Sequence, residues 1–405
     1  MSAQEFDIIV YGASGFTGKL VAEHLFKTYG TEGGMRWAIA GRDEEKLKAV
    51  RTEIGAPYSL PIIVAGATNS NALDAMAHRA RVIITTVGPY QRYGEGLLAA
   101  CAKAGTDYVD LCGEPNWMAA MIAKYEKTAR ESGARIVFSC GFDSIPFDCG
   151  VWYLQQEAKA RFGQPLRDVR GRVRKMKGTF SGGTLASMLA TLEAVKREPA
   201  LAARMTDPFL LSPERLTPQP DGDVVTEDAD INSWAAPFVM ASINTKNVHR
   251  TNALAHYPYG RDFTYSEMMA TGGGSKGKQR AKSALGASNM QRALLGFAPT
   301  RMLLTQFALP KPGEGPDKEA RETGMYDVLY VGTTSDGRAL RASVHGDKDP
   351  GYGSTSKMIS EAALTLKDTN RQTTPGGIWT PAAAMGDALI ARLQEKAGLT
   401  FKLEN

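Results

Sequence analysis

The sequence predicts an α/β protein with a Rossmann-type, doubly wound parallel sheet at its amino-terminal end and a second α+β domain with a mixed sheet. Two observations predict the first part: a glycine-rich turn directly after an apolar strand at 8–11, and an alternation of apolar strands with helices up to residue 145. Such alternation is typical of a parallel sheet covered on both faces. A third observation, the period-two pattern of side chains after residue 163, predicts the second domain.

The elements of the first domain follow in order along the chain. We expect strands over 8–11, 37–40, 61–65, 82–87, 107–111 and 135–140. Helices are expected over 19–29, 44–52, 96–104, 117–132 and 147–161. We assign residues 1–150 to this domain. A carboxyl-terminal segment over about 352–400 is expected to return to it and complete it, because the helix pattern over 380–397 is apolar on one side.

The second domain takes residues 151–350 and is expected to serve substrate binding or dimerisation. Its predicted strands are 168–177, 246–257, 326–333 and 339–345, with helices over 181–197 and 354–367. The last two strands are joined by an Asp336-Gly337 turn, which is a hairpin signal. Between 206 and 237 seven acidic residues and five prolines accompany a single base, Arg215, so we expect an irregular insertion there.

Composition excludes several classes of protein. Of the 405 residues 43% are hydrophobic and 22% charged, and the net charge of +5 does not favour a nucleic-acid partner. The four cysteines show neither a CxxC pair nor zinc spacing, so we predict free thiols, no metal site and a cytoplasmic protein. Neither a secretory signal nor an apolar run of ~18 residues is visible.

The first turn has the composition of a dinucleotide site. Gly12 would let the strand turn, Gly15 would let a pyrophosphate approach the helix, and Gly18 would let helix and strand pack closely. The hydroxyls of Ser14 and Thr17 would add hydrogen-bond donors. The alternative is a glycine-rich turn that only joins a strand to a helix, since a lone glycine triplet with GxxGxxG spacing is a weak motif.

The end of the second strand bears on which nucleotide binds. An NAD site usually carries an acid at this position, whereas this chain has Arg42, with Lys46 one helical turn further on. A guanidinium can hold a ribose 2′-phosphate through paired hydrogen bonds, so we predict NADP over NAD. Asp43 is expected to cap the following helix. The alternative is an ordinary surface arginine at position 42.

Two further strand ends are expected to reach the same crevice, because ligands bind at the carboxyl ends of parallel strands. The first carries four residues that would lie beside the nicotinamide half of the cofactor: Thr86, Val87, Gly88 and Tyr90. The second carries Asp143 and Ser144, directly before a helix with Pro146 in its first turn. The alternatives are core packing for Tyr90 and helix capping for Asp143 and Ser144.

Motifs along nearly the whole chain carry a family resemblance. The chain resembles the saccharopine dehydrogenase-like oxidoreductases in GASGFTG, AGRDEEKL, TTVGPYQRYGEGLLAACAKAGTDYVDLCGE and CGFDSIPFD. It is similar to their trans-acting enoyl reductase branch in PKPGEGPDKEARETGMY, GDKDPGYGSTSKMISEAAL and GGIWTPAAAMGDALIARL. That branch is associated with lipid and polyketide assembly.

The resemblance implies an NADP(H)-linked Rossmann domain, a second mixed-sheet domain and a carboxyl-terminal segment that returns to the first. It implies a phosphate-binding role for Gly12, Ser14, Gly15, Phe16 and Thr17. It implies 2′-phosphate binding by Arg42 and nicotinamide contacts by Thr86, Val87, Gly88 and Tyr90. One position departs from the pattern: many relatives hold an acid beside the adenine where this chain has Ala67.

The first function that the sequence supports is NADPH-dependent reduction of an enoyl group on an acyl thioester, either a small molecule or carrier-bound. The oxygen that gains charge needs a hydrogen-bond donor, and the α-carbon needs an acid. Tyr90, Asp143 and Ser144 are the candidate catalytic residues.

Two other functions stay open. One is reductive amination of an amino-acid substrate, whose carboxylates would bind the basic strand face formed by Arg170, Arg172 and Arg174. The other is a non-catalytic NADP-binding protein at a lipid surface, because residues 268–313 contain seven bases and no acid. The stretch at about 276–309 would then meet an anionic membrane, although it could equally meet an acidic carrier or only solvent. An exposed sheet in the second domain would also allow a homodimer.

Overall fold

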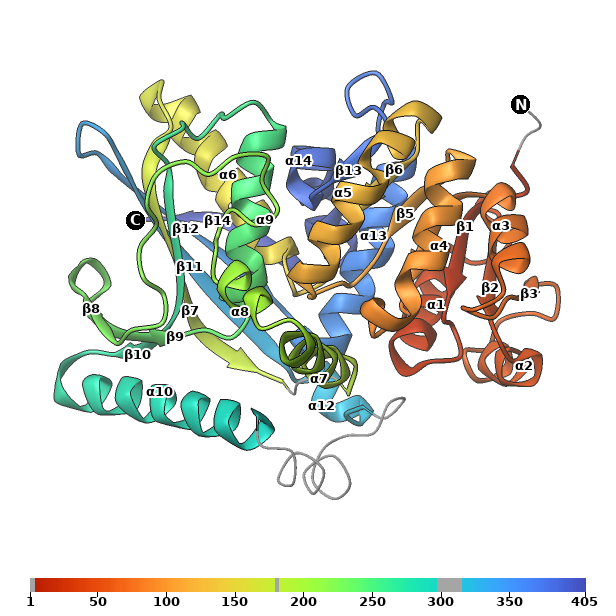
Figure 1. Ribbon diagram of the computed structural model, residues 1–405, viewed down its shortest axis with the longest axis horizontal. Coiled ribbons are helices and arrows are strands. Elements are labelled where there is room, and N and C mark those ends of the chain that lie inside the picture. Colours follow the sequence, from red (N-terminus) through yellow and green to blue (C-terminus); the bar gives the residue numbers. More distant parts are fainter. Residues whose placement is uncertain (1–3, 179–181, 297–314) are drawn as a thin grey trace.

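A computed structural model describes residues 4–178, 182–296 and 315–405, and shows two sheets side by side with helices between and around them (Figure 1). The first sheet has seven parallel strands in the order β13-β6-β5-β4-β1-β2-β3. Their bounds are β1 (Phe6–Tyr11), β2 (Trp37–Gly41), β3 (Ile62–Val64), β4 (Ala80–Thr85), β5 (Asp107–Val109), β6 (Arg135–Val137) and β13 (Gly377–Trp379). This order, with β1 at the switch point, confirms the predicted Rossmann-type fold.

Helices cover both faces of this sheet, which explains why its strands are apolar at every position. Ile8 and Val10 of β1 pack on one face, whereas Ile9 and Tyr11 pack on the other. The helices of this part are α1 (Phe16–Tyr29), α2 (Glu44–Glu53), α3 (Ser70–Arg79), α4 (Tyr90–Ala104), α5 (Pro115–Ser132) and α13 (Thr355–Asp368). β13 pairs with β6, so the carboxyl-terminal segment returns to the first sheet as predicted.

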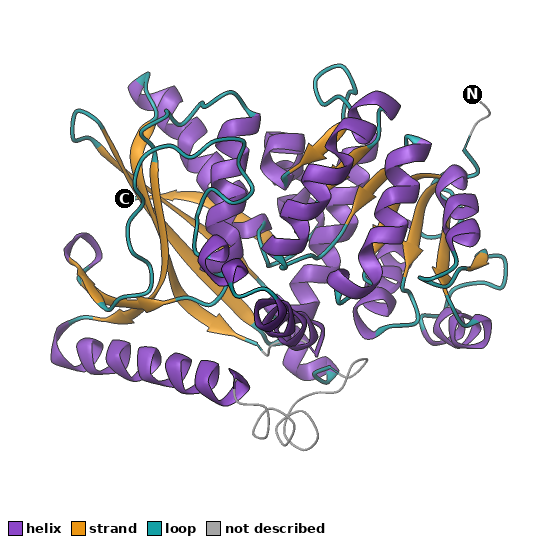
Figure 2. Cartoon of the chain, in the orientation of Figure 1, coloured by secondary structure: helices purple, strands orange, loops and turns teal. Residues whose placement is uncertain are grey.

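The second sheet, whose strands are orange at the left of Figure 2, is mixed. Its strand order is β14-β12-β11-β7-β10-β9-β8. Its strands are β7 (Leu166–Lys177), β8 (Thr226–Asp228), β9 (Ser233–Pro237), β10 (Thr264–Gly272), β11 (Met325–Thr334), β12 (Ala339–Gly346) and β14 (Leu399–Glu404). Only β7 and β10 run parallel among its neighbouring strands in the described ranges. The predicted hairpin is present, because β11 and β12 pair antiparallel on either side of the Asp336-Gly337 turn.

The remaining helices belong to the second domain or join the two sheets. They are α6 (Ile145–Phe162), α7 (Gly182–Arg197), α8 (Ala200–Met205), α9 (Ala241–Leu254), α10 (Gly274–Gly296), α12 (Lys318–Glu322) and α14 (Pro381–Lys396), with short turns η1 (Ala229–Ile231) and η2 (Pro350–Ser354). Within the ranges described, none of the helices is both long enough and apolar enough to cross a membrane.

Two expectations about the second domain are wrong. The strand predicted over 246–257 is instead the helix α9, whose buried face is mostly polar and therefore shows no apolar period of 3.6. Asn244, Asn247 and Arg250 on that face are buried and hydrogen-bonded to neighbouring elements. The segment 206–237 is not wholly irregular either, since it contributes the edge strands β8 and β9. Of the basic stretch at about 276–309, residues 297–309 lie outside the described residues.

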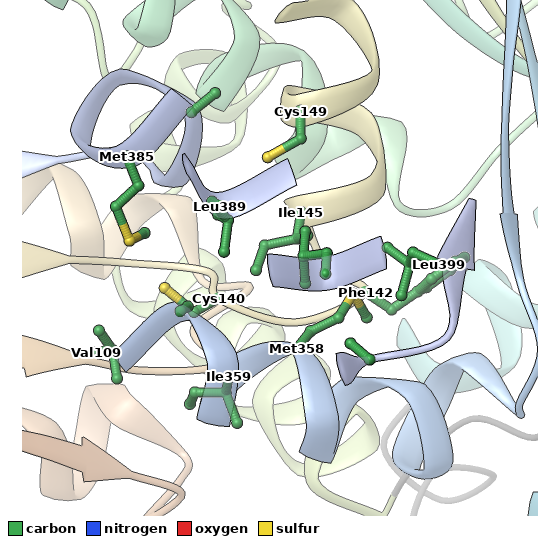
Figure 3. Close-up of a cluster of buried hydrophobic side chains, with 14 of the residues drawn as sticks. Val109, Cys140, Phe142, Ile145, Cys149, Met358, Ile359, Met385, Leu389 and Leu399 are labelled. Atoms are coloured by element: carbon green, nitrogen blue, oxygen red, sulfur yellow. The ribbon is translucent and has the colours of Figure 1, made fainter. Parts of the chain in front are cut away.

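A shared core joins the two domains at the start of α6. Cys140, Phe142 and Ile145, which follow β6, pack against α13 and α14 (Figure 3). Met358 and Ile359 of α13 belong to this cluster. The backbone of Phe142 is also fixed, because its N–H donates to Thr355 Oγ1 at 3.0 Å. The strand end that carries Asp143 is therefore rigidly placed between the sheets.

Candidate functional site

The turn between β1 and α1 leaves no room for side chains at two of its glycines. Gly12 has φ +90°, and a Cβ there would lie 2.7 Å from Thr86 Oγ1 and 2.8 Å from Val87 Cγ2. A Cβ on Gly18 would lie 2.1 Å from the Gly12 carbonyl oxygen. Both glycines thus have the predicted structural roles, the sharp turn and the close contact of helix and strand. Gly15 is the N-cap of α1, and no side chain caps this helix.

A cavity of about 1550 Å³ opens beside this turn, with walls from both domains. It brings together all the predicted cofactor residues: Gly12, Ser14, Gly15, Phe16, Thr17, Gly18, Arg42, Thr86, Val87, Gly88 and Tyr90. Asp143 also lines the cavity, whereas Ser144 does not. Gly66, Ala67 and Thr68, at the predicted adenine position, line it as well.

Arg42 lies at the end of β2 and is exposed. Within the described ranges its guanidinium makes no hydrogen bond or ion pair. Asp43 does not engage it, because Asp43 Oδ1 accepts the Lys46 N–H at 3.1 Å and caps α2 as predicted. The guanidinium is therefore available to an anionic ligand at the cavity edge.

Tyr90 holds two strand ends together. Its hydroxyl donates to the Thr85 carbonyl at 3.2 Å and accepts from the Leu111 N–H at 3.0 Å, and its ring packs against Trp117 with centroids 5.6 Å apart. Burial raises the pKa of Tyr90 well above its usual range. Both hydrogen-bonding functions of the hydroxyl are thus used by the backbone, which favours the packing role over proton donation.

Glu114, which was not predicted as a site residue, caps α4 from the start of α5. Its side-chain oxygens accept the backbone N–H groups of Tyr90 and Gln91, both at 2.9 Å. The Ser187 hydroxyl of α7 donates to the same group at 2.5 Å. The signal is hidden in the sequence, because Glu114 lies 24 residues after Tyr90 and caps a helix other than its own.

Asp143 is the group in the cavity wall best suited to hold a transferable proton. Burial raises the pKa of its carboxyl to about 7. Among the described residues the carboxyl has no hydrogen-bond partner, so neither of its protonation states is tied to a neighbour. It is held at the start of α6 by the core in Figure 3. A carboxyl of this kind can act as a general acid near neutral pH.

Ser144 turns away from the cavity into a buried polar network. It occupies the N-cap position of α6, but its hydroxyl makes no capping bond. Instead it donates to Asn244 Oδ1 at 3.2 Å and accepts from Asn247 Nδ2 at 2.5 Å. Asn244 Nδ2 in turn donates to Glu267 Oε1 at 2.7 Å. The geometry therefore gives Ser144 a positioning role between α6 and α9, in place of the predicted cap.

Glu267 on β10 is a second carboxyl in the cavity wall, and it is buried whereas Asp143 is half-buried. Burial raises its pKa to about 8, although hydrogen bonds from Asn244 and from the Tyr265 hydroxyl oppose this shift. Its oxygens are thus occupied by protein donors. In this Glu267 differs from Asp143. Its role could not be predicted from the sequence, because the strand β10 was not predicted.

The second-domain side of the cavity is largely apolar. Its wall includes Met176, Met188, Leu189, Met205, Phe209 and Phe238. The helix α7 spans this side and is tied to α4 of the first domain by Gln91 Nε2, which donates to Thr191 Oγ1 at 3.0 Å. An ion pair between Arg92 and Glu193 at 2.8 Å adds a second tie. An apolar wall of this kind suits a hydrocarbon chain.

The basic face of β7 is not a substrate site. Arg170 and Arg172 both bind Asp228 of the acidic segment, and Arg170 also pairs with Asp230. Arg174 pairs with Asp327 and Glu404, both at 2.7 Å. None of these three arginines lines the cavity described above. The expectation that this face binds substrate carboxylates therefore fails, because neighbouring acids already occupy the guanidinium groups.

Comparison with known proteins agrees with this arrangement. Residues 8–137 match the saccharopine dehydrogenase NADP-binding domain. A protein of Mycobacterium tuberculosis with the provisional name trans-acting enoyl reductase is 44% identical over 408 residues, which cover 96% of each chain. A trans-acting enoyl reductase of Mycobacterium bovis is 40% identical over 406 residues, again covering 96% of each. The chain belongs to this family.

This chain thus combines an NADP-binding domain of the saccharopine dehydrogenase type with the mixed sheet seen in Figure 2. The same fold occurs in apo saccharopine dehydrogenase (L-Glu forming) of Saccharomyces cerevisiae. That structure matches 99% of this chain and 100% of its own, with a TM-score of 0.56 at 14% identity. This likeness concerns the fold alone.

Proposed function

We propose that the protein is an NADPH-dependent enoyl reductase that acts on an apolar acyl thioester, as the names of its relatives suggest. The observation that carries the proposal is the shared cavity. It joins the glycine-rich turn and Arg42 to Asp143, a half-buried carboxyl with a raised pKa, and to an apolar wall. Reduction of an enoyl thioester needs these three parts: a nucleotide site, an acid, and space for an acyl chain.

The residues present fit an NADP cofactor. Gly12 and Gly18 leave the turn free of side chains, α1 begins without a side-chain cap, and Arg42 is unpartnered among the described residues. We assign the phosphates to the turn formed by Gly12, Ser14, Gly15, Phe16, Thr17 and Gly18. Arg42 would hold the 2′-phosphate, and Thr86, Val87, Gly88 and Tyr90 would border the nicotinamide. When bound, the cofactor supplies the hydride.

The residues of the chain then have separate tasks. Asp143, protonated below about pH 7, would give its proton to the α-carbon of the thioester. Tyr90 and Glu114 would fix the backbone beside the nicotinamide, and Ser144 would position the start of α6. α7, which forms part of the cavity wall, would help to exclude water from the reacting atoms. Reductive amination is not favoured, because the arginines expected to bind its substrate are paired with acids.

We also propose that the acyl group arrives on a carrier that meets α10. Four basic residues of α10 are exposed: Lys276, Lys278, Arg280 and Lys282. None of them forms an ion pair with the described part of the chain. Such a basic helix fits an acidic protein surface. A membrane contact through the same stretch, a homodimer and a cytoplasmic location stay predictions. Sedimentation with anionic liposomes at low salt tests the membrane contact. If the contact exists, the protein should sediment with the liposomes at low salt and be released when salt is added.

The decisive experiment follows NADPH oxidation with 2-enoyl thioesters of increasing chain length. We expect turnover that increases with chain length, and an Asp143→Asn variant with kcat reduced by about 100-fold or more while its Kd for NADPH is unchanged. Asp262→Asn, a surface substitution, is the matched control. Binding of NADPH without oxidation by any enoyl thioester would reject the reductase. Oxidation of NADPH in the presence of lysine and glutamate semialdehyde would instead support reductive amination as the function.

A further inference from the structure

A buried lysine occupies the wall of the same cavity. Lys246, on α9, is 2% exposed. Its Nζ donates to the Ser242 carbonyl, one helical turn earlier, at 2.7 Å. Within the described ranges this is the only hydrogen bond of the Lys246 ammonium, and it forms no ion pair there. An ammonium has three N–H donors, so two of them have no partner among the residues that the structure describes.

Such an arrangement is costly unless a ligand completes it. Lysine is among the residues least often buried without a partner, because removal of its charge from water is unfavourable. Burial lowers the pKa of Lys246 to about 8, and the charge of Asp207 opposes this shift. Asp207 is itself paired with Arg215, and His249 beside Lys246 has its pKa lowered to about 3 by burial and is neutral. Lys246 therefore keeps a positive charge at neutral pH.

The position of Lys246 indicates which atom it would meet. It shares the cavity with Met205, Phe209 and Ile243, which belong to the apolar side. The three other cations that line the cavity are exposed and lie at its edge: Arg42, Arg92 and Arg215. The side chains of Arg92 and Arg215 are 52% and 74% exposed. Phosphate groups remain hydrated and suit these exposed cations. A desolvated ammonium next to an apolar wall instead suits the neutral carbonyl oxygen at the head of an acyl chain.

We propose that the Lys246 ammonium binds the carbonyl oxygen of the acyl thioester and stabilises the charge that this oxygen gains. The inference rests on the proposed function. Hydride adds to the β-carbon, the electron pair of the C=C bond moves toward the carbonyl, and its oxygen becomes an enolate oxygen. The α-carbon then takes a proton from Asp143 and the carbonyl re-forms. A donor fixed at the oxygen lowers the energy of the charged stage more than that of the substrate.

The test compares Lys246→Met with Lys246→Arg, and uses Lys103→Met on the exposed surface of α4 as the control. Each variant is assayed with an enoyl-CoA and with the N-acetylcysteamine thioester of the same acyl group, which lacks the phosphates. We expect Lys246→Met to lower kcat by about 100-fold or more with both substrates. Lys246→Arg should recover part of this loss, and the Kd for NADPH should stay within twofold, which shows that the nucleotide domain is folded.

Two kinetic results would overturn the inference. If Lys246→Met lowers kcat with the enoyl-CoA only, Lys246 binds a phosphate of the coenzyme. If kcat of Lys246→Met stays within threefold of wild type with both substrates, Lys246 binds neither the phosphate nor the carbonyl oxygen.

A binding experiment separates this inference from the proposed function. Reductive ¹³C-methylation of the lysines gives NMR signals, and the Lys246 signal is identified by its loss in Lys246→Arg. A saturated hexadecanoyl thioester should shift this signal even if the wild-type protein reduces no enoyl thioester. In that case the proposed reduction fails and the binding role of Lys246 stands. No shift during binding, or no binding at all, would overturn the inference.

Discussion

Arg172 on β7 and Asp228 on β8 form a buried ion pair, with 2.9 Å between Arg172 Nε and Asp228 Oδ2. Their side chains are 4% and 1% exposed. Asp228 also accepts a hydrogen bond from Arg170 at 2.7 Å. Two carboxylates of the acidic segment 206–237, Asp228 and Asp230, thus neutralise two arginines of the basic strand β7.

Loss of Asp228 should therefore destabilise the protein strongly. In Asp228→Asn two guanidinium groups, one of them buried, would lose their shared carboxylate, and we expect the free energy of unfolding to fall by about 3–5 kcal/mol. Urea denaturation at pH 7 measures this change. Glu227→Gln, one residue earlier on the same edge strand but exposed, is the control and should change stability by less than about 0.5 kcal/mol. Equal midpoints for the two variants would show that the buried pair contributes little.

The first domain could be predicted from the sequence because its signals are local. Apolar strands, a glycine-rich turn and an arginine after the second strand each depend on a few neighbouring residues. The local pattern also predicts the positions of Gly12 and Gly18. A Cβ on Gly12 would collide with the residues that follow β4, and a Cβ on Gly18 would collide with the Gly12 carbonyl oxygen. Asp43 capped α2 as expected for the same reason.

The second domain and the substrate side of the cavity were harder to predict because their signals are long-range. α9 buries polar residues whose partners lie far along the chain: Asn247 meets Ser144, and Arg250 meets the Ile378 carbonyl. No period in the sequence distinguishes such a helix from a strand. For this reason the sequence did not identify Lys246, Glu114 and Glu267 as site residues. The role of each depends on contacts that cannot be predicted from neighbouring residues in the sequence.

Arg42 should determine the choice between NADPH and NADH. Its exposed guanidinium has no partner in the described part of the chain, so Arg42→Ala should leave the fold intact. We expect the Kd for NADPH to rise by about 10- to 100-fold, because a charged hydrogen-bonded contact is lost, while the Kd for NADH changes little. Fluorescence titration measures both constants. Arg36→Ala, just before β2, removes another exposed arginine and should affect neither.

Glu114 should couple the stability of α4 to cofactor binding. Glu114→Ala would leave the N–H groups of Tyr90 and Gln91 without an acceptor, and we expect the free energy of unfolding to fall by about 1–3 kcal/mol. The Kd for NADPH should rise as well, because the adjacent backbone at Gly88 lines the cavity. Ser187→Ala removes only the contact from α7 and should keep the wild-type Kd. An unchanged Kd in Glu114→Ala would restrict its role to stability.

The pH dependence of reduction should report the protonation of Asp143. Burial raises the pKa of this carboxyl to about 7, so it stays protonated up to near-neutral pH, and kcat/KM should fall as pH rises through about 7. Lys246 also lines the cavity and has a pKa of about 8, so loss of its proton would lower activity at higher pH. In Asp143→Asn the step near pH 7 should disappear from the residual activity, whereas any step near pH 8 should remain.

The same pKa predicts a change in stability that needs no substrate. The folded protein holds the Asp143 proton more tightly than the unfolded chain does, so this group's contribution is fully present below about pH 4 and is lost as pH rises through about 7. Asparagine does not titrate, and the Tm of Asp143→Asn relative to wild type should therefore increase between pH 4 and pH 8. Thermal unfolding at several pH values measures this difference. A difference that does not change with pH would mean that Asp143 is ionised in the folded protein, and it could then not act as the acid.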